Sequence, residues 1–152
     1  MKEDDKKILV IGIGNQGRAD DGLGWAFIDH IKDHLPENID HEYRYQLQIE
    51  DAELLSHYSE VYFVDADKKN WQQGFGFAPC KSDVSHGFST HELDPETVLY
   101  LANTIYNTYP KAYILGITGM DFQLKIGLSP KAEINLNGAL EYFNEKILHL
   151  IN

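Results

Sequence analysis

Two adjacent aspartates, Asp20 and Asp21, lie in a glycine-rich segment that spans residues 12–24 and reads GIGNQGRADDGLG. Its first six residues match the Gly-x-Gly-x-x-Gly pattern of dinucleotide-binding proteins, which place the pyrophosphate on the N-terminus of the following helix. Two carboxylates at that helix terminus would repel a pyrophosphate strongly at low effective dielectric. We therefore interpret the segment as part of a metal site, and we keep a nucleotide-binding module as an alternative.

The same segment continues into a predicted helix that carries Gly22 and Gly24 in its first turns. Each glycine costs a helix about 1 kcal/mol relative to alanine, which indicates that backbone or a partner approaches closely there. Asp20 or Asp21 can cap this helix, because a carboxylate accepts hydrogen bonds from the first N–H groups. We interpret Asp20 mainly as this cap and Asp21 as the residue that meets a metal.

Two further side chains with ligand chemistry are expected near Asp21. Asp65 ends a predicted buried strand, and His91 lies near the start of a predicted helix. In open α/β sheets, ligands bind beyond the carboxyl ends of the strands, so these side chains are expected at one edge of the sheet. Two oxygen ligands and one nitrogen ligand suit a divalent transition metal and leave positions open for another ligand. The predicted metal set is therefore Asp21, Asp65 and His91.

The remaining histidines and the cysteine are weaker candidates. His30 and His34 are four residues apart on a predicted helix, but they lie far from the strand ends, so we interpret them as solvated surface residues. His86 is close enough to His91 in the sequence to be a neighbour of the site. Cys80 is the only cysteine, which excludes an internal disulfide and a cysteine-rich zinc site, and we expect it to pack in the core.

Strands and helices alternate along the chain, as judged from apolar spacing and turn residues. We expect strands at residues 7–13, 41–49, 60–65, 75–80 and 111–118. We expect helices from Asp20 or Asp21 to Leu35, at residues 51–59, from about His91 to Ile105 with Thr90 as its cap, and at residues 130–151. The alternation predicts an α/β fold with three layers, in which helices cover both faces of a mostly parallel, twisted sheet of about five strands.

The composition is that of one globular domain covering residues 1–152, with 43% hydrophobic residues. The net charge of −11, from 13 basic and 24 acidic side chains, disfavours nucleic acid as a partner. No apolar run is long enough to cross a membrane, and the charged start at residues 1–7 is unlike a signal peptide. We therefore expect a cytoplasmic protein that does not bind membranes, and we expect a monomer.

Several segments, taken in order along the chain, resemble a known family, the hydrogenase maturation endopeptidases. These enzymes remove the C-terminal extension from the large subunit of nickel-iron hydrogenases. The matching stretches are ILVIGIGN at residues 8–15, DDGLG at 20–24, VDA at 64–66, THEL at 90–93, ILGI at 114–117 and GLSP at 127–130. The resemblance implies an endopeptidase whose partner is a hydrogenase large-subunit precursor.

The resemblance also implies roles for the predicted metal set. Asp21, Asp65 and His91 would dock onto nickel that the substrate's own cysteines hold, so the substrate supplies the metal, and zinc or cadmium could occupy the site in vitro. The metal would either only place the scissile bond or also activate water or the carbonyl. If it only positions the bond, Asp20 or Asp21 is the nearest general base.

The sequence departs from the family at two places. Thr118-Gly119 stands where a Glu-Pro or Gln-Pro pair is common, and Gln16-Gly17-Arg18 replaces a run that is usually more apolar. We expect these differences to alter which precursor is cut more than they alter the reaction. A non-catalytic homologue that binds the precursor or the metal without cutting remains a further alternative.

Overall fold

The structure is a computed structural model that describes residues 6–84 and 93–149. Its strands are β1 (Ile8–Ile13), β2 (Ile39–Arg44), β3 (Glu60–Asp67), β4 (Phe75–Pro79) and β5 (Lys111–Thr118). Its α-helices are α1 (Leu23–Ile31), α2 (Asp51–Leu55), α3 (Pro95–Tyr106) and α4 (Pro130–Phe143). Helix α1 is preceded by the 3-10 turn η2 (Ala19–Gly22) and followed by the 3-10 turn η3 (Lys32–His34). Helix α4 continues into the π-helical turn η4 (Asn144–Leu148).

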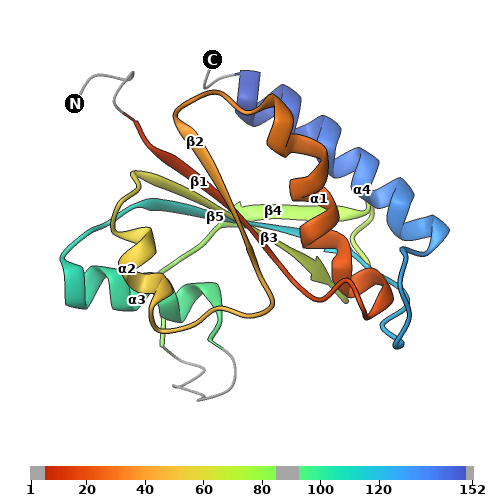
Figure 1. Cartoon of the computed structure of the whole chain (residues 1–152), viewed down its shortest axis with the longest axis horizontal. Coiled ribbons are helices and arrows are strands. Elements are labelled where there is room, and N and C mark those ends of the chain that lie inside the picture. Colours follow the sequence, from red (N-terminus) through yellow and green to blue (C-terminus); the bar gives the residue numbers. More distant parts are fainter. Residues whose placement is uncertain (1–5, 85–92, 150–152) are drawn as a thin grey trace.

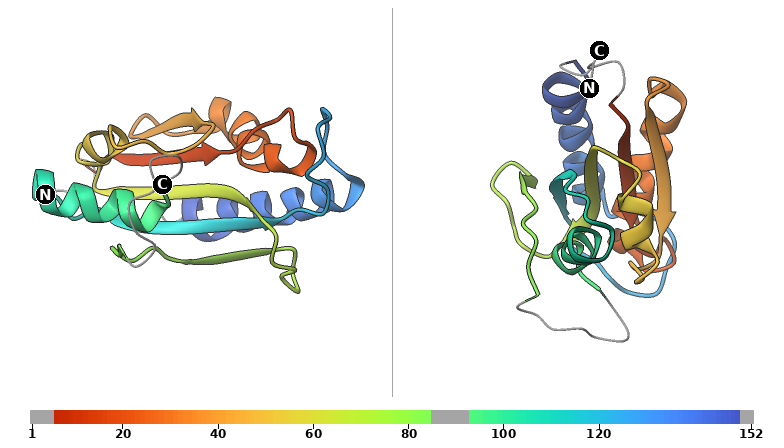
Figure 2. Two further views of the ribbon diagram at one scale, coloured as in Figure 1. Left: turned by 90° about the horizontal axis from the view of Figure 1, so that it is seen from below. Right: turned by 90° about the vertical axis from the view of Figure 1, so that its left-hand side faces the viewer.

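The strands form a five-stranded sheet in the order β2-β1-β3-β5-β4. Four strands are parallel, and β4 runs antiparallel to β5 at the edge. Figure 2 shows this order in its left view, from β2 along one side to β4 along the other. The predicted mostly parallel sheet of about five strands is confirmed.

The interior strand β1, between β2 and β3, is buried on both sides, because helices cover both faces of the sheet (Figure 1). Ile8 and Val10 pack with residues of α1 and α4, whereas Leu9 and Ile11 pack with residues of α2 and α3. A strand buried on both faces needs apolar side chains at every position, which explains its unbroken apolar sequence. The predicted three-layer arrangement is confirmed.

Several predicted boundaries are wrong. Strand β2 ends at Arg44 instead of residue 49, and β3 continues past Asp65 to Asp67. Helix α3 begins at Pro95, where the Asp94 carboxylate accepts a hydrogen bond of 2.8 Å from the backbone N–H of Thr97. An Asp-Pro pair is a strong helix start, because proline fits the first turn and the preceding aspartate caps it.

The predicted start of this helix, with Thr90 as cap and His91 in the first turn, falls outside the described residues. Ile105, predicted to face inward, is 58% exposed, because α3 presents its far end to solvent. Phe143 and Ile147 are buried as predicted, whereas Ile151 lies outside the described residues. In the part of the chain that the structure describes, no helix is long and apolar enough to cross a membrane.

Gly24 sets the distance between helix α1 and the sheet. A Cβ atom at this position would lie 2.4 Å from the carbonyl oxygen of Ile13 and 2.6 Å from that of Val64. Both contacts are with backbone, which cannot move aside without shifting β1 or β3. The prediction that backbone approaches the helix here is therefore confirmed, and the glycine lets the start of α1 pack against the end of β1 and against Val64 within β3.

We expect Gly24→Ala to lower the free energy of unfolding by about 2 kcal/mol or more, because the new methyl group overlaps two strands. Gly138→Ala in α4 is a matched control, since its Cβ would lie 3.5 Å from the nearest atom, in ordinary contact. In this control the free energy of unfolding is expected to rise by about 0.5–1 kcal/mol, because alanine has the higher helix propensity. Urea unfolding followed by circular dichroism measures both, and equal midpoints for the two variants would contradict the expected overlap.

Candidate metal-recognition pocket

A pocket of about 520 Å³ lies at the carboxyl edge of the sheet, at the ends of the neighbouring strands β1 and β3. From β1 the chain continues to β2, which pairs with β1 on the side away from β3. Such a switch in strand direction opens a crevice between the two strand ends. The pocket is lined by Asn15, Arg18, Asp21, Tyr45, Gln46, Asp65, Ala66, Lys68 and Phe122. The structure thus brings Asp21 and Asp65 to one pocket, whereas His91 and His86 lie outside the described residues.

The glycine segment holds the Asp21 carboxylate in a fixed orientation. The backbone N–H of Asn15 donates to Asp21 Oδ2 at 3.0 Å and to the Asp21 carbonyl oxygen at 3.1 Å. Gly14 has a φ of +145°, and a Cβ there would lie 2.0 Å from the Asp21 carbonyl oxygen. Glycine is therefore required at this turn, and the turn places Asp21 at the pocket.

Asp20 points away from the pocket and is fully buried. Its carboxylate accepts hydrogen bonds of 2.7–2.9 Å from the backbone N–H groups of Met120, Asp121 and Ser129 and from the Ser129 hydroxyl. Neither η2 nor α1 has a side-chain cap, so the prediction that Asp20 or Asp21 caps the helix is wrong. Asp20 instead binds the loop of residues 119–129 to the glycine segment.

The pKa of Asp20 reflects two opposing effects. Burial by itself disfavours the charged carboxylate, but the hydrogen bonds from Ser129, Met120 and Asp121 together outweigh burial and hold the pKa of Asp20 below its ordinary value. The group is therefore ionised, saturated with donors and closed to water. A general base needs access to the proton that it takes. For that reason we do not carry Asp20 forward as a catalytic candidate.

The loop of residues 119–129 forms one wall of the pocket through Phe122. Besides the bonds to Asp20, the backbone N–H of Ala19 donates to the Lys125 carbonyl oxygen at 2.8 Å. In Figures 1 and 2 this loop lies beside the chain that leaves β1. Two segments a hundred residues apart in sequence are thus joined by backbone hydrogen bonds and by one buried carboxylate.

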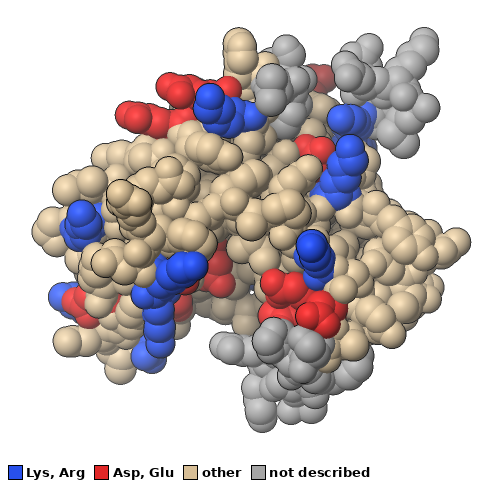
Figure 3. Space-filling view, turned by 180° about the vertical axis from the view of Figure 1, so that it is seen from behind, with Lys and Arg blue, Asp and Glu red and all other residues tan. Residues whose placement is uncertain are grey.

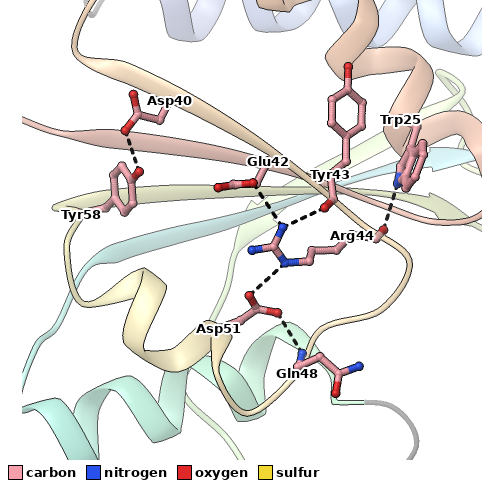
Figure 4. A network of polar contacts seen from close by, with 8 residues as sticks. All are labelled: Trp25, Asp40, Glu42, Tyr43, Arg44, Gln48, Asp51 and Tyr58. Atoms are coloured by element: carbon pink, nitrogen blue, oxygen red, sulfur yellow. Dashed lines mark hydrogen bonds and ion pairs between the residues drawn. The ribbon is translucent and has the colours of Figure 1, made fainter.

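Arg44, at the end of β2, is held by several polar contacts just before the chain reaches the pocket (Figure 4). Its guanidinium donates to the buried carboxylate of Asp51 at 3.0 Å and to Glu42 at 3.2 Å. Its carbonyl oxygen accepts a hydrogen bond of 2.9 Å from the indole of Trp25. The next two residues in the chain, Tyr45 and Gln46, line the pocket.

The pocket combines two charge types. Asp21 and Asp65 offer carboxylate oxygens to a cation, and Arg18 and Lys68 place positive charges in the same pocket. Carboxylate oxygens are suitable ligands for a divalent metal. In the described ranges alone, no three His, Cys, Asp or Glu side chains stand close enough together to hold a metal ion. The described part of the pocket therefore supplies two side chains of these types, Asp21 and Asp65.

The other candidates lie apart from this pocket. His30 and His34 are exposed and line a different cavity, near the far end of α1, together with His149. Cys80 is buried in the core as predicted, and burial raises the pKa of its thiol to about 12, so it is not a reactive thiolate. Lys68 was missed from the sequence, although its position three residues after Asp65 is a usable signal.

Comparisons with known proteins fit this architecture. The sequence matches no protein-family model and no curated protein. Its structure is similar to solved hydrogenase maturation proteases, so the chain has the fold of that class of protein. At 20–22% identity in the three compared below, the similarity shows the fold alone.

Three of these structures illustrate the similarity. The hydrogenase maturating endopeptidase HybD from E. coli is 21% identical, with a TM-score of 0.73 over 95% of this chain and 93% of that one. The NiFe hydrogenase maturation protease HycI from Thermococcus kodakarensis is 20% identical, with a TM-score of 0.73 over 92% and 91%. A hydrogenase 2 maturation peptidase from a Thaumarchaeota archaeon is 22% identical, with a TM-score of 0.69 over 92% and 97%.

Proposed function

We propose that this protein is an endopeptidase that removes the C-terminal extension of a nickel-iron hydrogenase large-subunit precursor after sensing nickel in that precursor. The observation that carries the proposal is the presence of Asp21 and Asp65 in one pocket at the carboxyl edge of the sheet. The fold shared with hydrogenase maturation proteases supports it. The partner is the precursor, and we infer a cytoplasmic monomer.

In this proposal the nickel ion belongs to the substrate. Asp21 and Asp65 supply two carboxylate ligands, and His91, which lies outside the described residues, supplies the imidazole. A set of three protein ligands leaves coordination positions that the precursor's own ligands fill. Zinc or cadmium would occupy the same ligands in vitro. A precursor without nickel would lack the metal contact that positions it in the pocket. Cleavage would therefore occur only after nickel has been inserted.

Hydrolysis requires a water molecule to lose a proton as its oxygen attacks the scissile carbonyl carbon. The substrate's metal supplies Lewis acidity for this step, or Asp21 takes the proton as general base. Asp21 suits the second role because its backbone partner Asn15 fixes its orientation while the residue still lines the pocket. Asp20 does not, because its oxygens face four donors in the interior.

The deciding experiment compares a nickel-loaded hydrogenase large-subunit precursor with the same precursor free of nickel, each incubated with the purified protein. We expect intact mass to show the loss of a C-terminal peptide from the loaded precursor alone. Equal cutting of both forms would rule out nickel sensing. Stable binding without shortening would favour a non-catalytic homologue, and stabilisation by NAD with no response to nickel would favour a nucleotide-binding module.

A further inference from the structure

The pocket contains two cations that the metal proposal does not use. Arg18 and Lys68 line it together with Asp21 and Asp65, in a chain with a net charge of −11 and only 13 basic side chains. Figure 3 shows that, on the face it displays, Lys and Arg are scattered and form no broad basic surface. Two cations in one pocket therefore stand out in a chain whose acidic side chains outnumber its basic ones 24 to 13.

Within residues 6–84 and 93–149, neither cation is paired with a carboxylate. Arg44 and Lys125 nearby are, in contrast, paired with acidic side chains. The Lys68 ammonium lies 5.4 Å from the centre of the Phe122 ring, a contact that holds it at the pocket wall and leaves its hydrogens available.

The backbone under both cations is fixed. The Arg18 N–H donates to the Asn15 carbonyl oxygen at 3.0 Å, and the Arg18 carbonyl oxygen accepts from the Asp21 N–H at 3.1 Å. Next to Lys68, the Asp67 carboxylate accepts from the Lys69 N–H at 2.9 Å and from the Trp71 indole at 2.8 Å. Long cationic side chains on a fixed backbone can reach a ligand without reordering the loops.

The chemistry of peptide hydrolysis gives such cations a purpose. Water oxygen adds to the carbonyl carbon, and the electron pair of the C–O double bond moves onto the carbonyl oxygen as a negative charge. The C–N bond then breaks, the amine takes a proton, and the carbonyl carbon ends as a carboxylate. Negative charge thus develops on the substrate in a pocket that already holds two carboxylates, and their field opposes it.

We propose that Arg18 and Lys68 form an anion-binding half of this pocket, which holds the developing oxyanion of the scissile peptide and then the carboxylate that cleavage produces. The catalytic part of this inference rests on the proposed function, because it requires peptide hydrolysis at this pocket. Charged donors aimed at an oxyanion lower the barrier because they interact more strongly with the transition state than with the neutral peptide.

The kinetic test uses the nickel-loaded precursor. Lys68→Met keeps the length of the side chain and removes its charge, and we expect kcat to fall about 10- to 100-fold while KM changes less than about threefold. Lys68→Arg is expected to restore part of the loss, which a purely structural role would not predict. Lys69→Met is the control, because the Lys69 ammonium stands 3.9 Å over the Trp71 ring and does not line the pocket.

A binding test works without cleavage. Acetate stands in for the product carboxylate and is titrated at constant ionic strength while backbone amide signals are followed by NMR. We expect saturable shifts at Arg18, Lys68 and their neighbours, lost in Arg18→Met/Lys68→Met and kept in Lys69→Met. If acetate shifts persist in the double variant, or if Lys68→Met processes precursor normally, the inference is overturned. If charge-dependent acetate binding occurs and no precursor is cut, the anion-binding half stands and the proposed function fails.

Discussion

Asp21→Asn is expected to abolish precursor processing while leaving the protein folded. The asparagine oxygen can still accept the hydrogen bond that the Asn15 N–H now gives to Asp21 Oδ2, so the glycine turn keeps its shape. The charge that attracts a metal ion or takes a proton from water is lost. Removing a residue that only orients a metal ligand typically lowers metal affinity or activity about 10- to 100-fold. Losing the ligand itself should therefore lower kcat/KM by about 100-fold or more.

Asp65→Asn is expected to have an effect of the same size, because Asp65 offers the second carboxylate of the same pocket. If the two act as one unit, the double variant will be scarcely slower than either single one. Asp33→Asn, an exposed aspartate in η3, is the control that changes charge equally. Cleavage is followed by intact mass and folding by circular dichroism. Near-normal processing by both single variants would remove the proposed site.

Asp20→Ala is expected to cause the largest loss of stability among the substitutions considered. The carboxylate is fully buried and accepts four hydrogen bonds, three of them from backbone N–H groups of the loop that carries Phe122. Removing a buried charged acceptor costs about 3–5 kcal/mol, because its donors lose a partner that water cannot replace in place. For a chain of this length that corresponds to a fall in Tm of roughly 6–20 °C.

Loss of this anchor should also release one wall of the pocket, so processing should fall along with stability. Thermal unfolding and cleavage of the nickel-loaded precursor measure the two effects. Asp33→Ala is the control for removal of an exposed aspartate and should change Tm by no more than about 1–2 °C. An Asp20→Ala protein as stable as the wild type would contradict the role assigned to this carboxylate.

The stabilisation by Asp20 should depend on pH in one direction. Its pKa in the folded protein lies below the ordinary value of 3.8, so folding favours the charged form. The stabilisation is therefore complete above the ordinary pKa and is lost as the pH falls through the lower folded pKa. Urea unfolding should show a constant gap between wild type and Asp20→Asn near neutral pH and a gap that narrows in acid. A gap that widens in acid would contradict this sign.

Much of the fold follows from local sequence patterns. The apolar run at residues 8–11 predicts a strand buried on both faces, and the helical spacing of Leu23, Phe27 and Ile31 predicts the face of α1 that packs on it. Ligands bind beyond the carboxyl ends of parallel strands, and those ends can be located from the local sequence. This rule is enough to predict that Asp21 and Asp65 lie at the same edge of the sheet. These features depend on neighbouring residues, so a single sequence is sufficient to predict them.

The tertiary structure decided the roles within the acidic pair. Asp20 appears from the sequence as a helix cap, because aspartate before a helix commonly has that role. Its real partners, Met120, Asp121 and Ser129, lie about a hundred positions further along the chain and leave no local pattern around Asp20. Only the packing of the loop against η2 shows that one aspartate is a buried anchor while its neighbour lines the pocket.

The same reason applies to the cations of the pocket. Arg18 and Lys68 lie in separate loops fifty residues apart, and no local pattern links one to the other. Because β1 and β3 are neighbours in the sheet, the loops that follow them place Arg18 and Lys68 in the same pocket as the two carboxylates. The sequence by itself therefore determined the layers, the sheet edge and the acidic residues at that edge. Which side chains line the pocket, and with what mixture of charges, depended on long-range contacts that form only in the folded chain.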